Sequence, residues 1–340
     1  MFLRLLSVLL SLFFLTGCER SKPTLRVFTW ASYFDSDVIA QFEEEYNCKV
    51  TLDMFDSNEL MYAKLRSGRE SYDIVTPSIY MAEIMAEQGM IEPIDYDKVR
   101  NIQYLDTDYC QLKDYVPYSV PYLLSFTGIG YLKGRVQEDD ISWSLFKDPK
   151  YKWRSTLLND FRETLGSGLI HLGLDPNFST AEDLAACVNE LKSWKVNIAK
   201  FENEQYKLGL DSAEFVLVHG YNGDIAQVMS ENPDVSFALP KEGFTYSVDV
   251  FCIQKGSEKR DLAHAFIDFM HRPQIAAHNI AHTLYLCPNS ASYKYLTPNL
   301  RSNTALFIPK EQMKRAHLLV DLGPGNNIFL EAWDKLKSSR

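Results

Sequence analysis

The sequence predicts an α/β protein of two lobes with a ligand cleft between them. Strand-like and helix-like segments alternate three times near the N-terminus with short links, which is typical of a parallel sheet covered by helices. The pattern restarts after Gly128, and a chain of 340 residues is long for a single hydrophobic core. Because ligands of such sheets bind beyond the carboxyl ends of the strands, we expect the functional side chains there.

The first half of the chain carries three strand–helix pairs. The segment from Leu25 to Trp30 is rich in β-branched and aromatic residues, and apolar residues recur at helical spacing between Asp37 and Tyr46. The same reasoning predicts, in order, a strand over 25–30, a helix over 37–46, a strand over 49–55, a helix over 58–65, a strand over 72–77 and a helix over 80–88. Trp30 and the segment 78–80 then lie at carboxyl ends of strands.

A similar alternation continues in the second half. The expected elements are a strand over 155–159, helices over 160–170 and 181–194, strands over 215–219, 235–239 and 248–253, and helices over 261–270 and 328–336. We expect the chain to cross between the lobes near residues 124–126 and again near Asp249. This division gives a first lobe of residues 24–125 plus 250–291 and a second lobe of residues 126–249 plus 292–340.

The N-terminus has the pattern of a bacterial lipoprotein signal. A positive charge at Arg4 precedes an apolar run over 5–15, and small residues then lead to Cys18. The run is shorter than the roughly 20 residues of a spanning helix. The alternative is an ordinary cleaved secretory signal. We expect residues 1–17 to be removed, Cys18 to carry lipid and residues 18–23 to form a tether, which places the protein in the periplasm or on the outer face of the cell membrane.

The net charge and the positions of the cysteines limit the classes of ligand and partner that the chain is expected to bind. The formal net charge of −10 argues against nucleic acid and is compatible with a cationic ligand. Most of the cysteines after Cys18 lie in apolar runs, where they are expected to pack as small hydrophobes, although an oxidising compartment would permit a disulfide. No pair has close metal-ligand spacing, so we expect neither a metal site nor a cofactor. These cysteines are Cys48, Cys110, Cys187, Cys252 and Cys287.

Aromatic residues and acids gather at the expected strand ends. Trp30 and Tyr33 are either core residues or a wall for an elongated cation, since aromatic faces attract ammonium groups. Asp160 and Glu163 lie one helical turn apart at the start of a helix. They form either a plain acidic first turn, with Arg162 as a surface partner, or a pair of acceptors for alkylammonium groups.

Two further segments couple an aromatic residue with an acid three residues later. Tyr221 precedes Asp224, although the Asn-Gly pair between them also indicates a simple turn. Tyr246 precedes Asp249, which lies between two valines in an otherwise apolar strand. Burial of that carboxylate without a cationic or hydrogen-bonding partner would be costly, so Asp249 is the strongest single candidate for a ligand contact.

In this combination the residues resemble the spermidine/putrescine-binding proteins of polyamine ABC importers. The resemblance runs from Leu25 to the C-terminus and implies a two-lobed periplasmic-binding-protein fold (type II). In that fold each lobe is a mainly parallel sheet with flanking helices, and the lobes close on the ligand by hinge motion. Its landmarks include Trp30-x-x-Tyr33, Tyr72-Asp-Ile-Val-x-Pro-Ser-x-Tyr80, Asp160-x-Arg-Glu163, Asp249 and Tyr285-x-x-Pro-Asn289.

The resemblance also implies a binding site. Its polyamine pocket would use aromatic residues for the methylenes and acids for the nitrogens. Ser32 stands where the family usually has an acid, Ser247 where it has a tryptophan, and Leu319 where spermidine binders have a glutamine, so the choice between putrescine and spermidine stays open. The implied contacts are Trp30, Ser32, Tyr33, Ser78, Tyr80, Asp160, Glu163, Tyr221, Asp249 and Tyr285, with Asp224 resembling an acid of the putrescine-preferring members.

The expected function is capture of a polyamine and its delivery to an ABC transporter permease in the membrane, without catalysis. One alternative is the same fold with another small cation such as a basic amino acid, for which Arg162 is the obvious partner of the ligand carboxylate. Another is an extracytoplasmic hydrolase that uses Asp160 and Glu163 as acid and base. Carboxylates one helical turn apart point the same way, whereas hydrolytic pairs flank the bond that they cleave. A lipid-anchored adhesin would not need acids paired with aromatic residues.

Overall fold

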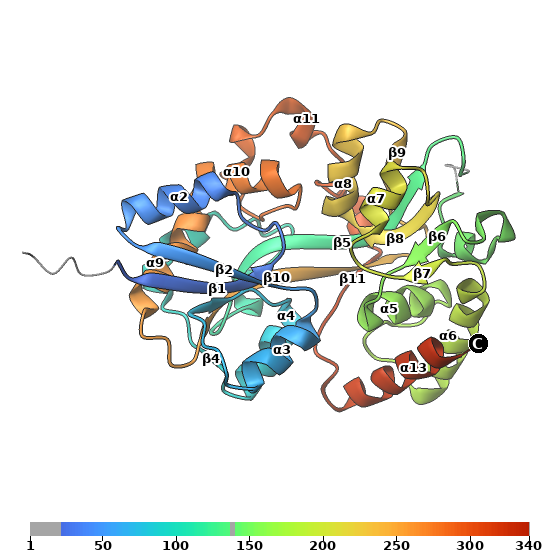
Figure 1. Cartoon of the computed structure of the whole chain (residues 1–340), viewed down its shortest axis with the longest axis horizontal. Coiled ribbons are helices and arrows are strands. Elements are labelled where there is room, and N and C mark those ends of the chain that lie inside the picture. Colours follow the sequence, from blue (N-terminus) through green and yellow to red (C-terminus); the bar gives the residue numbers. More distant parts are fainter. Residues whose placement is uncertain (1–21, 137–139, 340) are drawn as a thin grey trace, which may run out of the picture.

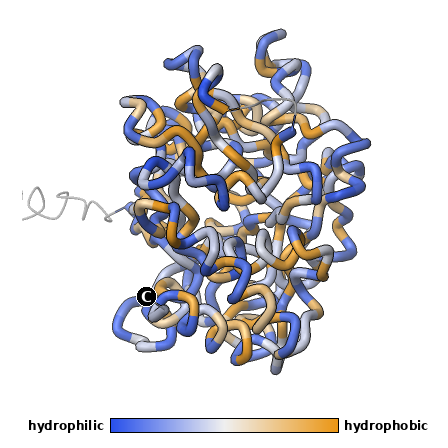
Figure 2. Tube along the Cα trace, turned by 90° about the vertical axis from the view of Figure 1, so that its right-hand side faces the viewer, coloured by the Kyte–Doolittle hydropathy of each residue, from blue (hydrophilic) through white to orange (hydrophobic). Residues whose placement is uncertain are grey.

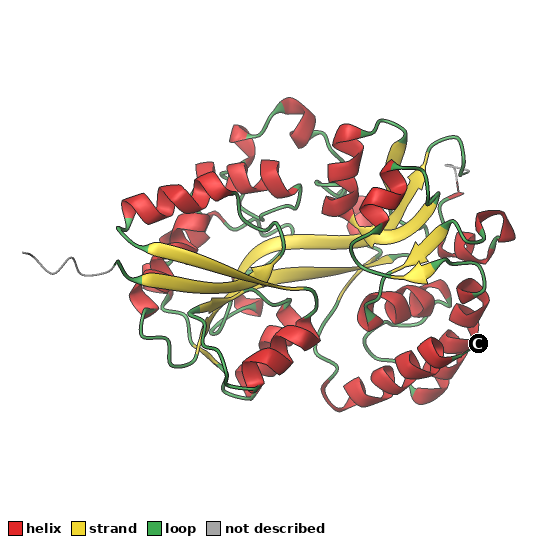
Figure 3. Cartoon of the chain, viewed as in Figure 1, coloured by secondary structure: helices red, strands yellow, loops and turns green. Residues whose placement is uncertain are grey.

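A computed structural model describes residues 22–136 and 140–339. The predicted signal and its Cys18 lie outside the described residues. Within the described part of the chain, no helix combines the length and apolar character needed to cross a membrane. Figure 1 and Figure 3 show strands and helices arranged in two groups, with two long strands running between them. The predicted α/β class is confirmed.

The strands are β1 (Thr24–Trp30), β2 (Lys49–Phe55), β3 (Ile74–Val75), β4 (Ile91–Glu92), β5 (Val120–Leu132), β6 (Ser155–Leu157), β7 (Lys200–Phe201), β8 (Leu217–Tyr221), β9 (Val235–Ala238), β10 (Phe244–Gln254) and β11 (Ala316–Leu318). The helices are α2 (Ser36–Glu45), α3 (Asn58–Arg66), α4 (Ile79–Glu87), α5 (Phe161–His171), α6 (Ala181–Lys195), α7 (Tyr206–Asp211), α8 (Asn222–Glu231), α9 (Arg260–Met270), α10 (Pro273–Thr283), α11 (Pro298–Arg301), α12 (Lys310–Met313) and α13 (Asn326–Ser338).

The sheet order places β5 and β10 in the middle. The main path runs β2-β1-β3-β10-β5-β8-β6-β7. The predicted parallel pairing is confirmed at both ends, where β2, β1 and β3 are parallel and β7, β6 and β8 are parallel. The two middle strands are antiparallel to each other and to their outer neighbours β3 and β8. β10 pairs with β3 of the first end group, β5 pairs with β8 of the second, and the two long strands pair with each other, so β5 and β10 join the two groups, as Figure 1 shows.

A register shift in this pair lies at the acid that the sequence singles out. Asp249 of β10 pairs with Leu123 of β5, whereas the next residue, Val250, pairs with Pro121, so Tyr122 is the extra residue on β5. Such a bulge bends the strand and redirects side chains. It also tolerates a proline, which lacks the N–H that a regular ladder requires.

The prediction contained no strand over 120–132, and the structure corrects this. Pro121, Gly128 and Gly130 argue against a strand when only the sequence is read. In the structure all of β5 is buried, and the glycine at 128 leaves room for a neighbour, because a Cβ there would lie 2.7 Å from the Phe237 ring. The alternative that the Asn-Gly pair forms a loop is also wrong, since α8 begins at Asn222.

Two hydrophobic clusters form the interior. The first, hereafter the first core, joins β1, β3 and α9 with the first half of β5 and with apolar residues along the whole of β10. The second core joins α5, α6, β8 and α13 with the remainder of β5. The segment that contains Leu306, Ile308 and Leu319 packs in the first core. Figure 2 shows hydrophobic stretches running through the interior and hydrophilic ones at the periphery.

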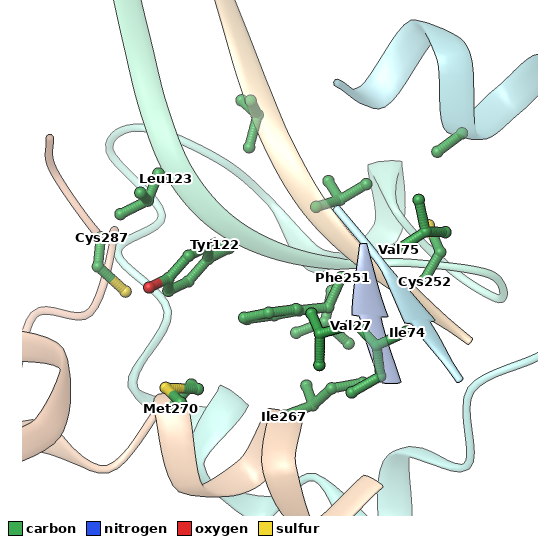
Figure 4. Packing of buried hydrophobic residues seen from close by; sticks show 14 of the residues in the cluster. Val27, Ile74, Val75, Tyr122, Leu123, Phe251, Cys252, Ile267, Met270 and Cys287 are labelled. Atoms are coloured by element: carbon green, nitrogen blue, oxygen red, sulfur yellow. The ribbon is translucent and has the colours of Figure 1, made fainter. Parts of the chain in front are cut away.

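The cysteines of the described chain are buried and free. Cys252 and Cys287 belong to the first core, and Figure 4 shows both among the apolar side chains that surround Tyr122 and Phe251. Burial raises the pKa of the Cys187 thiol to about 12 in the second core. The expectation that these residues pack as small hydrophobes is confirmed, and no disulfide joins those in the described residues.

Candidate functional site: a cleft lined by acids and aromatic rings

Every residue of the predicted site within the described chain lines one cavity of about 130 Å³. The cavity lies where the two cores face each other, because Tyr33 and Ser78 come from the side of the first core and Asp160 and Tyr221 from the second. Trp30 ends β1 and Tyr221 ends β8, so the rule that ligands gather at carboxyl ends of strands holds on both sides.

Asp249 is held by two neutral hydroxyl groups. The Tyr33 hydroxyl donates to one carboxylate oxygen, and Ser78 Oγ donates to the other at 2.7 Å. Ser78 and Asp249 also form an isolated bridge between their backbones. The side chain is only 3% exposed, and burial raises the pKa of Asp249 to about 6, although the two hydroxyls oppose this rise. Both groups that hold the carboxylate are neutral, so neither compensates its charge.

Asp160 caps a helix and also lines the cavity. Its carboxylate caps α5 by accepting hydrogen bonds from the backbone N–H of Arg162 at 2.9 Å and of Glu163 at 3.1 Å. The same side chain lines the cavity. Burial raises the pKa of Asp160, while these backbone hydrogen bonds lower it. A capping acid that also faces a cavity is ready to accept a cation without any rearrangement of the helix.

Glu163 lies one turn further along α5 and is 3% exposed. Its Oε2 accepts hydrogen bonds from Thr127 Oγ1 at 3.0 Å and from the Thr245 hydroxyl. Burial, and then the negative charge of Asp160, raise the pKa of Glu163 to about 8. Two buried acids so close together favour a bound positive charge, because a cation relieves both the burial cost and the mutual repulsion.

Arg162 is a buried residue, so its interpretation as a surface partner is wrong. The side chain is 1% exposed, and its guanidinium donates to the Val320 carbonyl at 2.9 Å and to Asn177 Oδ1 at 2.8 Å. Its Cζ lies 5.3 Å from the centroid of the Tyr80 ring. The guanidinium thus joins the start of α5 to the segment after β11 and supports one aromatic wall of the cavity.

Asp224 already has several partners. It accepts hydrogen bonds from the Tyr206 hydroxyl at 2.6 Å and from the Tyr285 hydroxyl at 2.9 Å, and Lys207 Nζ lies 3.7 Å from Oδ2. The Tyr285 ring packs against the first turn of α8, where only glycine fits, because a Cβ at Gly223 would lie 2.5 Å from that ring. This side of the cavity is therefore more preorganised than the Asp249 side.

The three positions that depart from the family pattern all line the cavity. Ser32 has a φ of 58°, a left-handed conformation that is uncommon outside glycine, asparagine and aspartate. The buried hydroxyl of Ser247 has no hydrogen-bond partner among the described residues, and Leu319 is buried. The cavity is accordingly less aromatic and less acidic at these positions than the resemblance alone implies.

Sequence reasoning missed several residues of the site. Asn58 connects two predicted residues, since it accepts from the Ser78 N–H at 3.1 Å and donates to Ser78 Oγ at 3.1 Å and to the Tyr80 hydroxyl at 3.0 Å. Asp56 follows β2 directly, so the strand-end rule could have found it. Lys207 lies in the short helix α7, which has no clear periodicity, and no sequence signal pointed to it.

Comparison with known proteins supports a common fold and family. The model of the family described as bacterial extracellular solute-binding protein matches residues 37–308. The spermidine/putrescine-binding periplasmic protein of Escherichia coli is 31% identical over 93% of this chain and 92% of its own length. The putrescine-binding periplasmic protein of the same bacterium is 29% identical, over 94% and 92% of the two chains.

Solved structures agree with this. A putative spermidine/putrescine ABC transporter protein from Listeria monocytogenes superposes with a TM-score of 0.87 at 29% identity, covering 93% of this chain and 99% of that one. A lipoprotein of Treponema pallidum superposes with a TM-score of 0.83, also at 29% identity, over 92% and 99% of the two chains.

Proposed function

Because the chain belongs to the family of bacterial extracellular solute-binding proteins, we propose that it captures a polyamine, putrescine or spermidine, and delivers it to the permease of an ABC transporter. It acts as a receptor and carries out no catalysis. The relatives at about 30% identity are spermidine- or putrescine-binding proteins, and the similarity extends over nearly their whole length. The family is one of solute-binding transport proteins.

The observation that carries the proposal is a set of three buried or half-buried acids that form no ion pair with a basic side chain of the described residues. Asp249 and Glu163 accept hydrogen bonds from neutral hydroxyls, and Asp160 accepts from backbone N–H groups. Burial raises the pKa of all three carboxyl groups. A bound polycation offsets this cost, and aromatic faces beside the acids cover its methylenes. Exclusion of water on lobe closure strengthens the ion pairs.

Two contacts disfavour the alternatives. A basic amino acid needs a cationic partner for its carboxylate. Of the two basic residues that line the cavity, Arg162 is bound to Val320 and Asn177, and Lys207 lies between the carboxylates of Asp224 and Glu204, which repel a ligand carboxylate. A hydrolase needs an acid and a base on opposite sides of a bond. Here Asp160 and Glu163 extend from the same helix start, and the Asp160 carboxylate is committed to capping that helix.

Isothermal titration calorimetry of the purified chain tests the function. We expect putrescine or spermidine to bind, and the mono-acetylated form of the same amine to lose about 1.5–3 kcal/mol of binding free energy, because acetylation deletes a charge that a fixed carboxylate meets. Equal affinity for putrescine and N-acetylputrescine would contradict the proposed site. Native mass spectrometry of the chain as purified gives an independent result, since a co-purifying amine is identified by its mass.

We also propose a lipid anchor. Residues 1–17 act as a lipoprotein signal, Cys18 carries the lipid, and residues 18–23 tether the lobes to the membrane on the extracytoplasmic side. The similar protein of Treponema pallidum is described as a lipoprotein. Cys18→Ser should abolish labelling of the chain with a fatty-acid precursor and move the protein out of the membrane fraction, while polyamine binding is retained. Labelling of the variant at the level of the unmodified chain would contradict the anchor.

The division into lobes is part of the proposal. Residues 24–125 plus 250–291 and residues 126–249 plus 292–340 would move as two bodies about the crossings in β5 and β10. The two separate hydrophobic cores support such a motion, because each body then retains its own packed interior. The packing of Leu306 and Ile308 in the first core supports movement of the segment before β11 with the first body.

A further inference from the structure

A lysine side chain occupies one end of the cleft. Lys207 lines the cavity, and its Nζ lies 3.7 Å from Asp224 Oδ2 and 3.6 Å from Glu204 Oε2. The side chain is 30% exposed, whereas that of Asp224 is 16% exposed. The ammonium group of this lysine therefore lies at the acid that the resemblance to putrescine-preferring proteins marks as a ligand contact.

The backbone around Lys207 is fixed, so only its side chain is free to move. Tyr206, the preceding residue, donates its hydroxyl to Asp224 at 2.6 Å and accepts from the backbone N–H of Tyr221 at 3.3 Å. Asn203, four residues before Lys207, accepts a hydrogen bond at its Oδ1 from the backbone N–H of Asn159 at 2.8 Å. These contacts hold the start of α7 against the ends of β6 and β8, and they set the reach of the lysine toward Asp224.

Asp224 and Glu204 offer Lys207 two alternative partners. Both carboxylates are within 4 Å of the same Nζ, and both line the cavity. An amine that enters this end of the cleft can take the place of Nζ at Asp224 while the lysine retains Glu204. The other basic residue of the cavity, Arg162, has no such freedom, because Val320 and Asn177 hold its guanidinium.

We propose that Lys207 is a specificity-determining residue that competes with the ligand's terminal ammonium group for Asp224. The inference rests on the proposed polyamine-binding function and adds a property to it. The ammonium group of Lys207 lowers the affinity of the cleft for amines whose own ammonium group reaches Asp224. The comparison is the same cleft with an uncharged side chain at position 207. Amines held only by the Asp249 and Glu163 end are affected less, so Lys207 shifts the choice among amines of different length and charge.

Calorimetry on the unmodified chain and on a set of variants tests the proposal with putrescine and spermidine as the probes. Lys207→Met keeps the length of the side chain and removes its charge, and we expect it to tighten binding of at least one of the two amines by about two- to fivefold, the range of a partly exposed ion pair. In the Asp224→Asn background the same Lys207→Met change should have little effect, because the contested carboxylate is gone. Lys207→Arg keeps the charge and should bind as the unmodified chain does.

Lys314→Met serves as a matched control, since it deletes an exposed lysine that pairs with Glu311 outside the cavity. It should leave both affinities unchanged. Unchanged or weaker binding by Lys207→Met overturns the proposal, and so does a gain that persists at full size with Asp224→Asn. Failure of the unmodified chain and of every variant to bind either amine would instead overturn the proposed function.

Discussion

Asp249→Asn is expected to cost about 2–5 kcal/mol of polyamine binding free energy while leaving the empty protein as stable as before or more stable. The loss follows from the removal of a buried charge that meets an ammonium group in a water-excluded cleft. The gain follows from burial, which raises the pKa of Asp249 from 3.8 to about 6 in the folded chain. At neutral pH, that rise corresponds to about 3 kcal/mol of lost stability at most, which the neutral amide does not incur.

The effect of Asp249 on the free energy of unfolding depends on pH, because the carboxyl group ionises at a lower pH in the unfolded chain than in the folded one. Below pH 3.8 the carboxyl group is protonated in both the folded and the unfolded chain, and the cost is absent. As the pH rises from about 4 to about 6, the unfolded chain ionises first and the folded chain loses stability relative to it. The stability gained by Asp249→Asn should therefore be full above pH 6 and vanish toward pH 4. Melting curves across this range, with and without putrescine or spermidine, measure both the stability and the ligand-induced shift.

Asp73→Asn is a matched control for this experiment. Asp73 is also a buried acid, but it accepts hydrogen bonds from the Arg26 backbone at 2.8 Å and from Ser257 Oγ at 2.6 Å, and it pairs with Lys259 at 3.4 Å. It lies outside the cavity. Its substitution should lower the melting temperature and preserve the full ligand-induced shift. If Asp249→Asn behaves in the same way, Asp249 is a structural residue and its ligand role is refuted.

Arg162→Met is expected to destabilise the folded chain by about 3–5 kcal/mol, the cost of removing one partner from a buried charged network. The substitution removes the donor to the Val320 carbonyl and one of the two donors to Asn177 Oδ1, which also accepts from the Val320 N–H. It also removes the positive charge that lowers the pKa of Glu163 and Asp160, so both acids become more costly to ionise. Urea denaturation of the empty chain measures the loss.

An exposed arginine provides the comparison. Arg272 donates to both carboxylate oxygens of Glu45 at 2.7 Å, but this ion pair lies at the surface. Arg272→Met should cost less than about 1 kcal/mol, because water screens exposed ion pairs. Equal losses for the two substitutions would show that the burial of Arg162 adds nothing to the stability of α5.

Much of the site could be predicted because its residues follow strands directly. Trp30 ends β1, Tyr221 ends β8, and Asp160 follows β6 as the cap of α5. Local periodicity reveals where strands end, and parallel strands bring their carboxyl ends to the same edge of a sheet. The resemblance added Ser32, Ser78 and Tyr285, and all three line the same cavity.

The errors arose where contacts between distant segments override local patterns. The strand β5 was missed because its proline and glycines argue locally against a strand, whereas the bulge opposite Asp249 and the packing of Phe237 against Gly128 require them. The alternative in which Arg162 is a surface partner of Asp160 and Glu163 is wrong for the same reason. Its partners Val320 and Asn177 are far away along the chain. Burial of such a group depends on the long-range fold, which a period of 3.6 residues does not encode.

By itself, the sequence determined the α/β class, the strand ends that carry the aromatic residues and acids, and the cationic character of the expected ligand. Each of these depends on residue type and local spacing. Only the tertiary structure decided that Asp249 is held by Tyr33 and Ser78, that Arg162 is buried, and that Lys207 reaches Asp224. Those contacts join segments that are brought together when β5 and β10 cross between the two cores, and the free energy of each contact depends on the burial that this crossing creates.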